Sequence, residues 1–303
     1  MTNKDTDDKS KMGAWMLAAR PRTLPAAVAP VLVGTAMAIA DKHFAWLPAA
    51  AALTVALLLQ IGVNLANDYF DYIKGIDTRD RLGPPRVTQS GLIPAKQVKT
   101  GMLIAIILSV VPGLYLASVG GWPIIFVGLS CFAAALAYSG GPFPLASHGL
   151  GDLFVFIFFG LVAVGGTYYV QALQITPMVC LMGAIQGLLI TAILVVNNLR
   201  DIQTDRRSGK RTLAVRIGEQ GSRIEYLLLL GIAYAIPFIL WLSGRSSAWV
   251  LLPVFSLPLA ISLTRRIWKS AGGPALNQTL ANTAKLTLVY SMLLSIGLIL
   301  SFG

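Results

Sequence analysis

The segment NLANDYFDYIKGID, residues 64–77, places amide and carboxylate side chains at helical spacing directly after an apolar run. At 100° per residue, four of them fall within an arc of roughly 100° on one helix face. These four are Asn64, Asn67, Asp68 and Asp71. Because grouped carboxylates repel one another and are costly near a bilayer, this face requires a cation beside it.

A second segment, NNLRDIQTD at residues 197–205, repeats the pattern after another apolar run. Its Asn197, Asp201 and Asp205 are four residues apart and therefore form a similar stripe on one helix face. Each segment continues into a stretch that is rich in arginine, lysine and glycine. The chain therefore carries the same set of chemical groups twice.

Both stripes offer only oxygen atoms as ligands, without histidine or cysteine. Arginine or lysine is one kind of cation that suits them. A hard divalent cation is another, and Mg²⁺ in particular binds through a few carboxylates together with substrate phosphate oxygens. Basic residues suited to such phosphates follow both stripes. They are Lys74, Arg79, Arg81, Arg86, Arg200, Arg206, Arg207, Lys210 and Arg211. This pattern predicts a metal-bridged diphosphate site.

These segments have two other interpretations. A helix end solvated by lipid headgroups explains a single stripe well, but it explains less well two stripes that both lead into basic, glycine-containing loops. The run SGKRT at 208–212 is similar to the end of a Walker A loop, yet it lacks the earlier glycine and a preceding strand. We therefore do not expect a nucleotide site there.

Membrane helices are the elements expected to position the two stripes. The chain has 303 residues, of which 55% are hydrophobic and 12% charged, and its mean hydropathy is +0.70. A soluble domain carries about 25% charged residues. Apolar runs near the length that spans a bilayer recur throughout, so we expect an all-α polytopic membrane protein with nine transmembrane helices. Their ranges are 24–40, 48–70, 98–118, 122–138, 151–172, 177–197, 223–243, 247–263 and 280–302.

The net charge of +11 is a signal of topology. Of the 24 Lys and Arg residues, all but Lys42, Arg245 and Lys285 lie before the first range or at the junctions that follow the second, sixth and eighth ranges. These junctions share one membrane side, and the positive-inside rule makes that side the cytosol. We therefore expect a cytosolic N-terminus and no nucleic-acid partner.

We expect one domain over residues 1–303, with a polar cytosolic tail at 1–14 and cytosolic active-site loops at 72–97 and 200–222. Loops of this kind carry function more often than the elements they connect. The tail lacks the pattern of a secretory signal. Cys131 and Cys180 fall inside apolar runs, so we expect packing roles for them.

Several residues are open to two interpretations. The basic segment RPRTLP at 20–25 is either an orientation anchor or a phosphate contact through Arg20 or Arg22. Tyr138 is either an interfacial aromatic or a group that faces the reaction centre. Asp152 suits a helix cap as well as a site residue. The aromatic run FVFIFFG at 154–160 is interpreted as ordinary packing in preference to a dedicated lipid groove.

NDYFD at 67–71 and NNLRDIQTD at 197–205 resemble the two aspartate-rich motifs of the UbiA superfamily of intramembrane prenyltransferases. Four stretches are similar to the branch of that superfamily that prenylates 1,4-dihydroxy-2-naphthoate. They are RPRTLPAAVAPVLVGTA, NLANDYFDYIKGIDTRDRLGPPRVTQSG, GLGD and NNLRDIQTDRRSGKRTLAVRIGE. The resemblance covers nearly the whole chain and implies a UbiA-type helical bundle.

The resemblance also implies roles for individual residues. Mg²⁺ bridged to a prenyl diphosphate would be held by Asn67, Asp71, Asn197, Asp201 and Asp205, with Asp68 and Asp77 as outer or auxiliary ligands. Substrate binding falls to Arg20, Arg22, Asn64, Lys74, Arg86, Gln89, Arg200 and Lys210. Tyr138 would line the allylic cation and, with Asp71, Asp201 and Asp205, completes the catalytic set. His148 receives no role.

The activity implied by the resemblance is transfer of a polyprenyl group to 1,4-dihydroxy-2-naphthoate, with loss of diphosphate and CO₂, giving demethylmenaquinol. The expected setting is the bacterial inner membrane, among its lipids, with the active site facing the cytosol. Alternatives are a related transferase acting on 4-hydroxybenzoate or haem, a non-catalytic quinone-binding protein, and an anionic-lipid transporter. A transporter predicts ionisable residues at the bilayer midplane, whereas the charges here lie at one end of the predicted spans.

Overall fold

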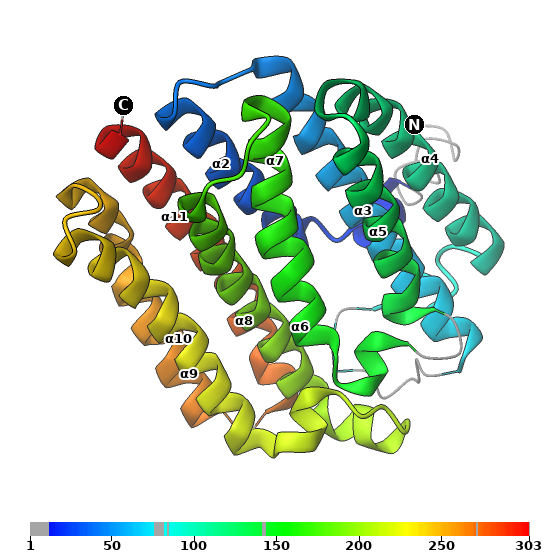
Figure 1. The fold of residues 1–303 in the computed structure, drawn as a ribbon. Coiled ribbons are helices and arrows are strands. Elements are labelled where there is room, and N and C mark those ends of the chain that lie inside the picture. Colours follow the sequence, from blue (N-terminus) through cyan, green and yellow to red (C-terminus); the bar gives the residue numbers. More distant parts are fainter. Residues whose placement is uncertain (1–11, 76–81, 84, 141–143, 271, 303) are drawn as a thin grey trace, which may run out of the picture.

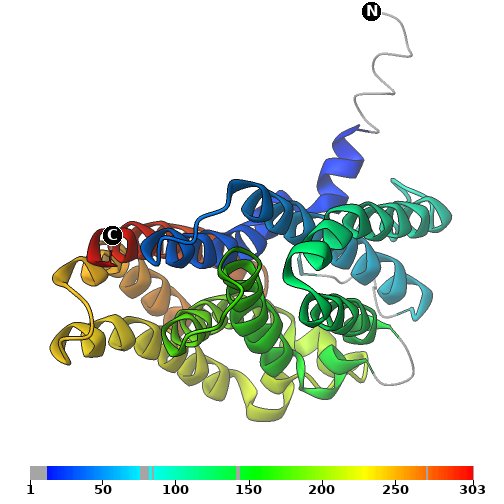
Figure 2. The same cartoon turned by 45° about the horizontal axis from the view of Figure 1, so that its top comes forward.

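The computed structural model describes residues 12–75, 82–83, 85–140, 144–270 and 272–302, and every regular element in these ranges is helical. Residues 12–19 form a first helix, which lies at the edge of the bundle (Figure 2). The remaining elements, in chain order, are η1 (Pro21–Thr23), α2 (Pro25–Ala40), α3 (Trp46–Ile73), α4 (Ala95–Gly120), α5 (Trp122–Ser139), η2 (Leu145–His148), α6 (Gly151–Val155), the π-helix η3 (Phe156–Val162), α7 (Ala163–Ala172), α8 (Pro177–Arg207), α9 (Leu213–Leu242), η4 (Ala248–Ser256), α10 (Leu257–Lys269), η5 (Gly273–Leu276) and α11 (Asn277–Phe302). Figure 1 shows them as one helical bundle.

All nine predicted transmembrane ranges are largely helical in the part of the chain that the structure describes. Seven helical segments are long and apolar enough to cross a membrane. An eighth is added if Met12–Thr23 and Pro25–Ala40, which meet at a 50° bend, form one span. The apolar helix Trp122–Tyr138 is shorter than the others. An all-α membrane protein with seven or eight such segments is therefore confirmed.

The predicted loop at 200–222 is wrong in its extent. Helix α8 continues to Arg207 and α9 begins at Leu213, which leaves only residues 208–212 between them. Charged residues end an apolar run without ending a helix, because a helix that leaves the hydrocarbon is solvated by water and headgroups. For the same reason α3 extends to Ile73, and the predicted tail at 1–14 gives way to helix from residue 12.

Helix α8 is the centre of the bundle (Figure 1). In the most apolar 18-residue stretch of α8, 78% of the residues are buried. The corresponding share in the other six candidate spans is 22–39%. It contacts α9, α11, α2, α7 and η3. The helix that carries the second acidic motif is therefore held on several sides, which fixes the direction of its polar end.

Close packing joins α8 to the π-helix η3. A Cβ atom on Gly160 would lie 2.5 Å from Gly187 Cα and 2.6 Å from Gly183 O. Both neighbours are backbone atoms, which cannot rotate away. Small residues of this kind let two membrane helices approach closely. Gly160, Gly183 and Gly187 therefore hold η3 close to α8. Phe158 and Phe159 of η3 line the cavity.

Replacing Gly160 with alanine is expected to lower the thermal unfolding midpoint of the detergent-purified protein, because an overpacked core costs roughly 1–3 kcal/mol. Gly165→Ala is the matched control, since its Cβ would meet only Ile175 Cδ1 at 3.7 Å, an ordinary contact. That control should keep the midpoint or raise it, because alanine favours helix over glycine. Equal midpoints for the two variants would contradict the packing argument.

Candidate active site

A cavity of about 710 Å³ lies between helices α2, α3, α4, α5, α7 and α8 and the π-helix η3. Both acidic motifs open into one end of it, and the remainder is lined mainly by aliphatic and aromatic side chains. The motif residues along its wall are Asn64, Asn67 and Asp71 from α3, and Asn197, Asp201 and Asp205 from α8. The structure thus brings together two stripes that are about 130 residues apart in sequence.

Asp71 is the meeting point of three segments. Its Oδ2 lies 2.6 Å from Arg86 Nη2 and 3.6 Å from Lys210 Nζ. Arg86 belongs to the segment after α3, and Lys210 to the turn after α8. Asp71 and Arg86 are both buried, so little solvent screens the pair. These cations supply the positive charge that the first stripe requires.

Asp201 is paired with its neighbour Arg200. The guanidinium donates from Nε to Asp201 Oδ1 at 2.8 Å and from Nη2 to Asp201 Oδ2 at 2.5 Å. The same Nη2 donates to Asn197 Oδ1 at 2.9 Å. Two parallel bonds of this type fix orientation as well as charge. Arg200 is itself buried and does not line the cavity, so its effect passes through Asp201 and Asn197.

Asn277, at the start of α11, completes this arrangement. Arg200 Nη1 donates to Asn277 Oδ1 at 3.0 Å, and Asn277 Nδ2 donates to Leu82 O at 2.9 Å. The segment that follows the first motif is thereby tied to the second motif through α11. Asn277 is not predictable from the sequence, because an isolated Asn in an unremarkable stretch carries no periodic or motif signal.

Asp68 does not line the cavity, unlike its three neighbours in the first stripe. It is buried, and its carboxylate accepts bonds from Val87 N and Thr88 N, each at 3.2 Å. A carboxylate held by backbone N–H groups stabilises the turn that contains them. Asp68 therefore positions the turn from which Arg86 reaches Asp71.

Asn64 faces the N-terminal side of the site. Its Nδ2 donates to Ala19 O at 2.9 Å and to Thr23 Oγ1 at 3.0 Å, and its Oδ1 accepts from Gln60 Nε2 at 3.5 Å. These bonds fasten the bend before α2 to α3. Arg20, which stands at that bend with φ 52°, lines the cavity.

Other predicted substrate-binding residues lie outside the lining. Arg22 and Lys74 are exposed, and Gln89 is half-buried; none of the three lines the cavity. Asp77 falls outside the described residues. The structure therefore gathers the predicted site around α3 and α8, with Arg20, Arg86 and Lys210 as the cations along its wall.

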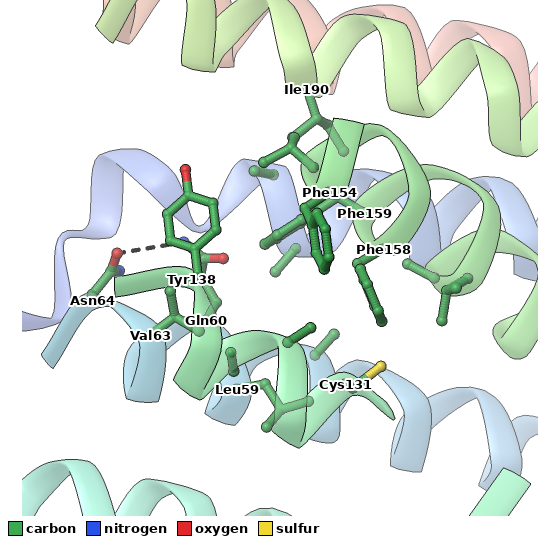
Figure 3. A pocket seen from close by; sticks show the side chains of 18 of the residues that line it. Leu59, Gln60, Val63, Asn64, Cys131, Tyr138, Phe154, Phe158, Phe159 and Ile190 are labelled. Carbon is green, nitrogen blue, oxygen red and sulfur yellow. Dashed lines mark hydrogen bonds between the residues drawn. The ribbon is translucent and has the colours of Figure 1, made fainter. Parts of the chain in front are cut away.

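An aromatic wall faces the motif of α3. Tyr138, near the end of α5, lies beside Asn64, and Phe154, Phe158 and Phe159 stand on the other side of the cavity (Figure 3). The interpretation of the run 154–160 as ordinary packing was wrong for these three phenylalanines, which line the cavity. Phe158 and Phe159 belong to the π-helix η3, and Phe154 belongs to α6 directly before it.

Asp152 is buried at the start of α6 and does not line the cavity. The glycine-rich segment before it does reach the site. Arg211 N donates to Ser147 O at 2.9 Å and Arg216 Nη2 donates to His148 O at 2.8 Å. These hydrogen bonds hold the turn after α8 against η2. Ser147 and Lys210 both line the cavity.

The donor atoms of the two motifs suit a hard divalent cation. All the side chains at this end of the cavity that can act as ligands offer oxygen. Within the described ranges, no group of three His, Cys, Asp or Glu residues gathers closely enough to hold a metal ion without help. This arrangement fits Mg²⁺ bound through a few protein oxygens plus substrate phosphates, and it does not fit a metal cage made by protein alone.

Comparison with known proteins agrees with this geometry. The profile of the UbiA prenyltransferase family matches residues 27–291. The chain is 41% identical to a 1,4-dihydroxy-2-naphthoate octaprenyltransferase of Mycobacterium tuberculosis, over 95% of this chain and 97% of that protein. It is 39% identical to the enzyme of the same name from Escherichia coli, over 96% and 97% of the two chains.

Solved structures show a similar fold. A UbiA homologue from Archaeoglobus fulgidus bound to GPP and Mg²⁺ aligns with a TM-score of 0.64 at 13% identity, over 93% of this chain and all of that one. At that level of identity the likeness concerns the fold. Together with the profile match and the two relatives, it leads to one conclusion: this chain belongs to the UbiA prenyltransferase family.

Proposed function

We infer that this chain is a Mg²⁺-dependent prenyltransferase that moves a polyprenyl group from polyprenyl diphosphate to 1,4-dihydroxy-2-naphthoate. Diphosphate and CO₂ are released and demethylmenaquinol, a menaquinone precursor, is formed. One observation carries this inference: the two acidic motifs open into the same end of a cavity whose other walls are apolar. Such a cavity suits a substrate with an anionic head and a hydrocarbon tail. The choice of 1,4-dihydroxy-2-naphthoate as the acceptor is based on the names of the two similar enzymes.

We assign metal binding to Asn67 and Asp71 on α3, and to Asn197, Asp201 and Asp205 on α8, because these residues line the polar end of the cavity. When bound by these residues, Mg²⁺ would supply Lewis acidity and positive charge next to the diphosphate. Asp68 is assigned a positioning role through the Val87–Thr88 turn. Any role for Asp77 stays a prediction.

The leaving diphosphate is bound by the basic side chains at the same end. Arg86, Lys210 and Arg20 line the cavity together with the acidic motifs, so their charges are available to a diphosphate bound there. Cations held in place before the reaction stabilise the charge that develops on the leaving oxygen, and in a site that excludes water this effect is large. Arg200 acts indirectly, by orienting Asp201 and Asn197.

The carbocation left on the prenyl group is formed next to the aromatic wall. The rings of Tyr138, Phe154, Phe158 and Phe159 line the cavity there. Aromatic rings attract a cation through their π-faces, and they exclude water that would otherwise capture it. The electron-rich acceptor ring then forms the new C–C bond. Its carboxylate leaves as CO₂, and the electron pair of the broken C–C bond restores aromaticity.

We propose a topology of nine spans with a cytosolic N-terminus and the polar end of the cavity on the cytosolic side of a bacterial inner membrane. Support comes from the basic junctions described above, which lie at this end. The short helix α5 has 18 residues, about 27 Å in length, and this is close to the roughly 30 Å of a bilayer core.

The acceptor assignment is tested with membranes that contain the protein, Mg²⁺ and a polyprenyl diphosphate. We expect prenyl transfer to 1,4-dihydroxy-2-naphthoate with release of CO₂, and no transfer to 4-hydroxybenzoate. Removal of Mg²⁺ with EDTA should abolish the reaction, and added Mg²⁺ should restore it. Transfer to 4-hydroxybenzoate alone would assign the chain to a different branch of the family.

A further inference from the structure

Asn198 is a buried polar residue of α8 to which the site described above gives no role. It is 9% exposed and lines the cavity. Within the described part of the chain its amide makes no hydrogen bond, whereas Oδ1 of its neighbour Asn197 accepts one from Arg200. A buried amide without a partner costs free energy, so each one in a native protein calls for an explanation. Because Asn198 lines the cavity, a molecule bound there can supply the partner.

The position of Asn198 on α8 sets it apart from the residues to which we assign metal binding. On a helical wheel it lies about 100° from Asn197 and about 60° from Asp201. Asp205 is closer in angle, but it is seven residues away, about 10 Å along the axis. The cavity-lining neighbour of Asn198 is Leu194, one turn before it on the same face. Asn198 therefore lies at the edge of the metal-binding stripe.

The turn of α8 before Asn198 faces Tyr138. A Cβ atom built on Gly151 would lie 3.4 Å from Tyr138 Oη and 3.5 Å from Leu194 Cδ2, so these two side chains meet around one point. Ala146 Cα of η2 is 3.6 Å from the same point. Tyr138 belongs to the aromatic wall of the cavity (Figure 3). Asn198 thus lies between this wall and the polar end of the cavity.

An amide at this place matches the acceptor better than the donor. The diphosphate of the donor is an anion, and Arg20, Arg86 and Lys210 already line the cavity as its cations. The acceptor carries two ring hydroxyl groups. Its 1-hydroxyl is next to the carboxylate and donates to it within the molecule, whereas its 4-hydroxyl has no such partner. The oxygen of an amide accepts a hydrogen bond from a hydroxyl group.

We propose that Asn198 determines specificity for the acceptor: its Oδ1 accepts a hydrogen bond from the 4-hydroxyl group of 1,4-dihydroxy-2-naphthoate and holds the ring beside Tyr138. The proposal rests on the function inferred above and adds a residue that distinguishes one acceptor from another. An analogue without the 4-hydroxyl group leaves the buried amide unpaired, which is how a hydrogen-bonding site rejects such a molecule.

The test uses the Asn198→Leu variant, reconstituted with Mg²⁺ and a polyprenyl diphosphate, because leucine has a similar size and no polar atom. The KM for 1,4-dihydroxy-2-naphthoate should rise about tenfold, the scale of one lost hydrogen bond, while the KM for the donor and the Mg²⁺ dependence stay within about threefold.

Two competitive inhibitors identify the hydroxyl group. The inhibition constant of 4-hydroxy-2-naphthoate should rise about tenfold in the variant, and that of 1-hydroxy-2-naphthoate should change by less than about twofold. Equal changes for the two inhibitors would overturn the proposal.

Two further variants and a stability measurement make the result decisive. Asn198→Ala should raise the same KM. Asn282→Leu on α11 is the control, because Asn282 lies outside the cavity, where its Oδ1 accepts from Gln278 at 3.1 Å; its KM for the acceptor should match that of the unmodified protein. Asn198→Leu should keep the thermal unfolding midpoint or raise it, since it removes an amide that has no partner in the protein.

The outcomes separate this proposal from the proposed function. A lower unfolding midpoint of Asn198→Leu with an unchanged KM for the acceptor would limit Asn198 to a structural role and overturn the proposal. If the unmodified protein does not convert 1,4-dihydroxy-2-naphthoate, the proposed function fails. Activity of the unmodified protein together with an unchanged KM in both Asn198 variants refutes only the role of Asn198.

Discussion

The Asp201→Asn variant is expected to lose prenyl transfer by more than about 100-fold, since changes to the outer partners of a metal site already cost 10–100-fold. Asp201 lines the polar end of the cavity and is oriented by two bonds from Arg200. Asparagine keeps the shape and one oxygen, so Arg200 retains a partner, while the negative charge that attracts Mg²⁺ is removed. The measurement is kcat at saturating donor over a range of Mg²⁺ concentrations.

Asp41→Asn is the matched control for this variant. Asp41 lies directly after α2, outside the cavity, where its Oδ2 accepts a bond of 2.6 Å from Tyr168. The same chemical change at that position should leave the dependence on Mg²⁺ unaltered. An Asp201→Asn protein with full activity and the same Mg²⁺ dependence as the control would remove Asp201 from the proposed metal site.

The Arg86→Met variant is expected to lower kcat/KM for the donor by roughly 100-fold, the scale of losing one preorganised charge-stabilising donor. Arg86 lines the cavity and approaches Asp71 to 2.6 Å, so methionine removes a cation from the diphosphate region and leaves Asp71 with Lys210 at 3.6 Å. Methionine keeps most of the apolar stem. Thermal unfolding of the variant should show a loss of stability too, because breaking a buried pair leaves a charge uncompensated.

Comparison with Arg86→Lys separates charge from structure. Lysine retains the positive charge without the planar fork. The KM of the Arg86→Lys variant for the donor should therefore be closer to that of the unmodified protein than the KM of the Arg86→Met variant is. Arg245→Met changes an exposed arginine outside the cavity and should match the unmodified protein in both measurements. A Met variant that loses stability but keeps its kcat/KM would limit Arg86 to a structural role.

The membrane helices and the site's polar end were predictable because their signals are local. Hydropathy marks a span within its own residues, and a spacing of four marks a stripe on a single helix. The orientation of Asp68, by contrast, depends on the fold of the whole bundle. On a helical wheel this residue lies at the edge of the arc, about 40° from Asn64 and on the side away from Asn67, and the bundle turns it toward residues 87 and 88.

Features that depend on distant partners could not be predicted in this way. Asn277 bonds both to Arg200 and to Leu82, residues that approach it only in the folded bundle. The aromatic composition of the π-helix Phe156–Val162 suits an α-helix equally well, and the π-helix is identified by its backbone and by close contacts to Gly183 and Gly187. The extent of the cavity likewise depends on which faces of α3, α4, α5 and α7 meet.

The lengths of α3 and α8 have a consequence for where the two substrates meet. With 28 and 31 residues these helices measure about 42 and 46 Å, which exceeds a hydrocarbon core of roughly 30 Å. Their acidic ends therefore stand above the hydrocarbon, in the layer where headgroups and water mix. A water-soluble acceptor reaches this layer without crossing the hydrocarbon core. The polyprenyl donor reaches it while its apolar tail stays in the hydrocarbon core. The product, having exchanged its anionic head for a quinol ring, is released to the lipid phase alone.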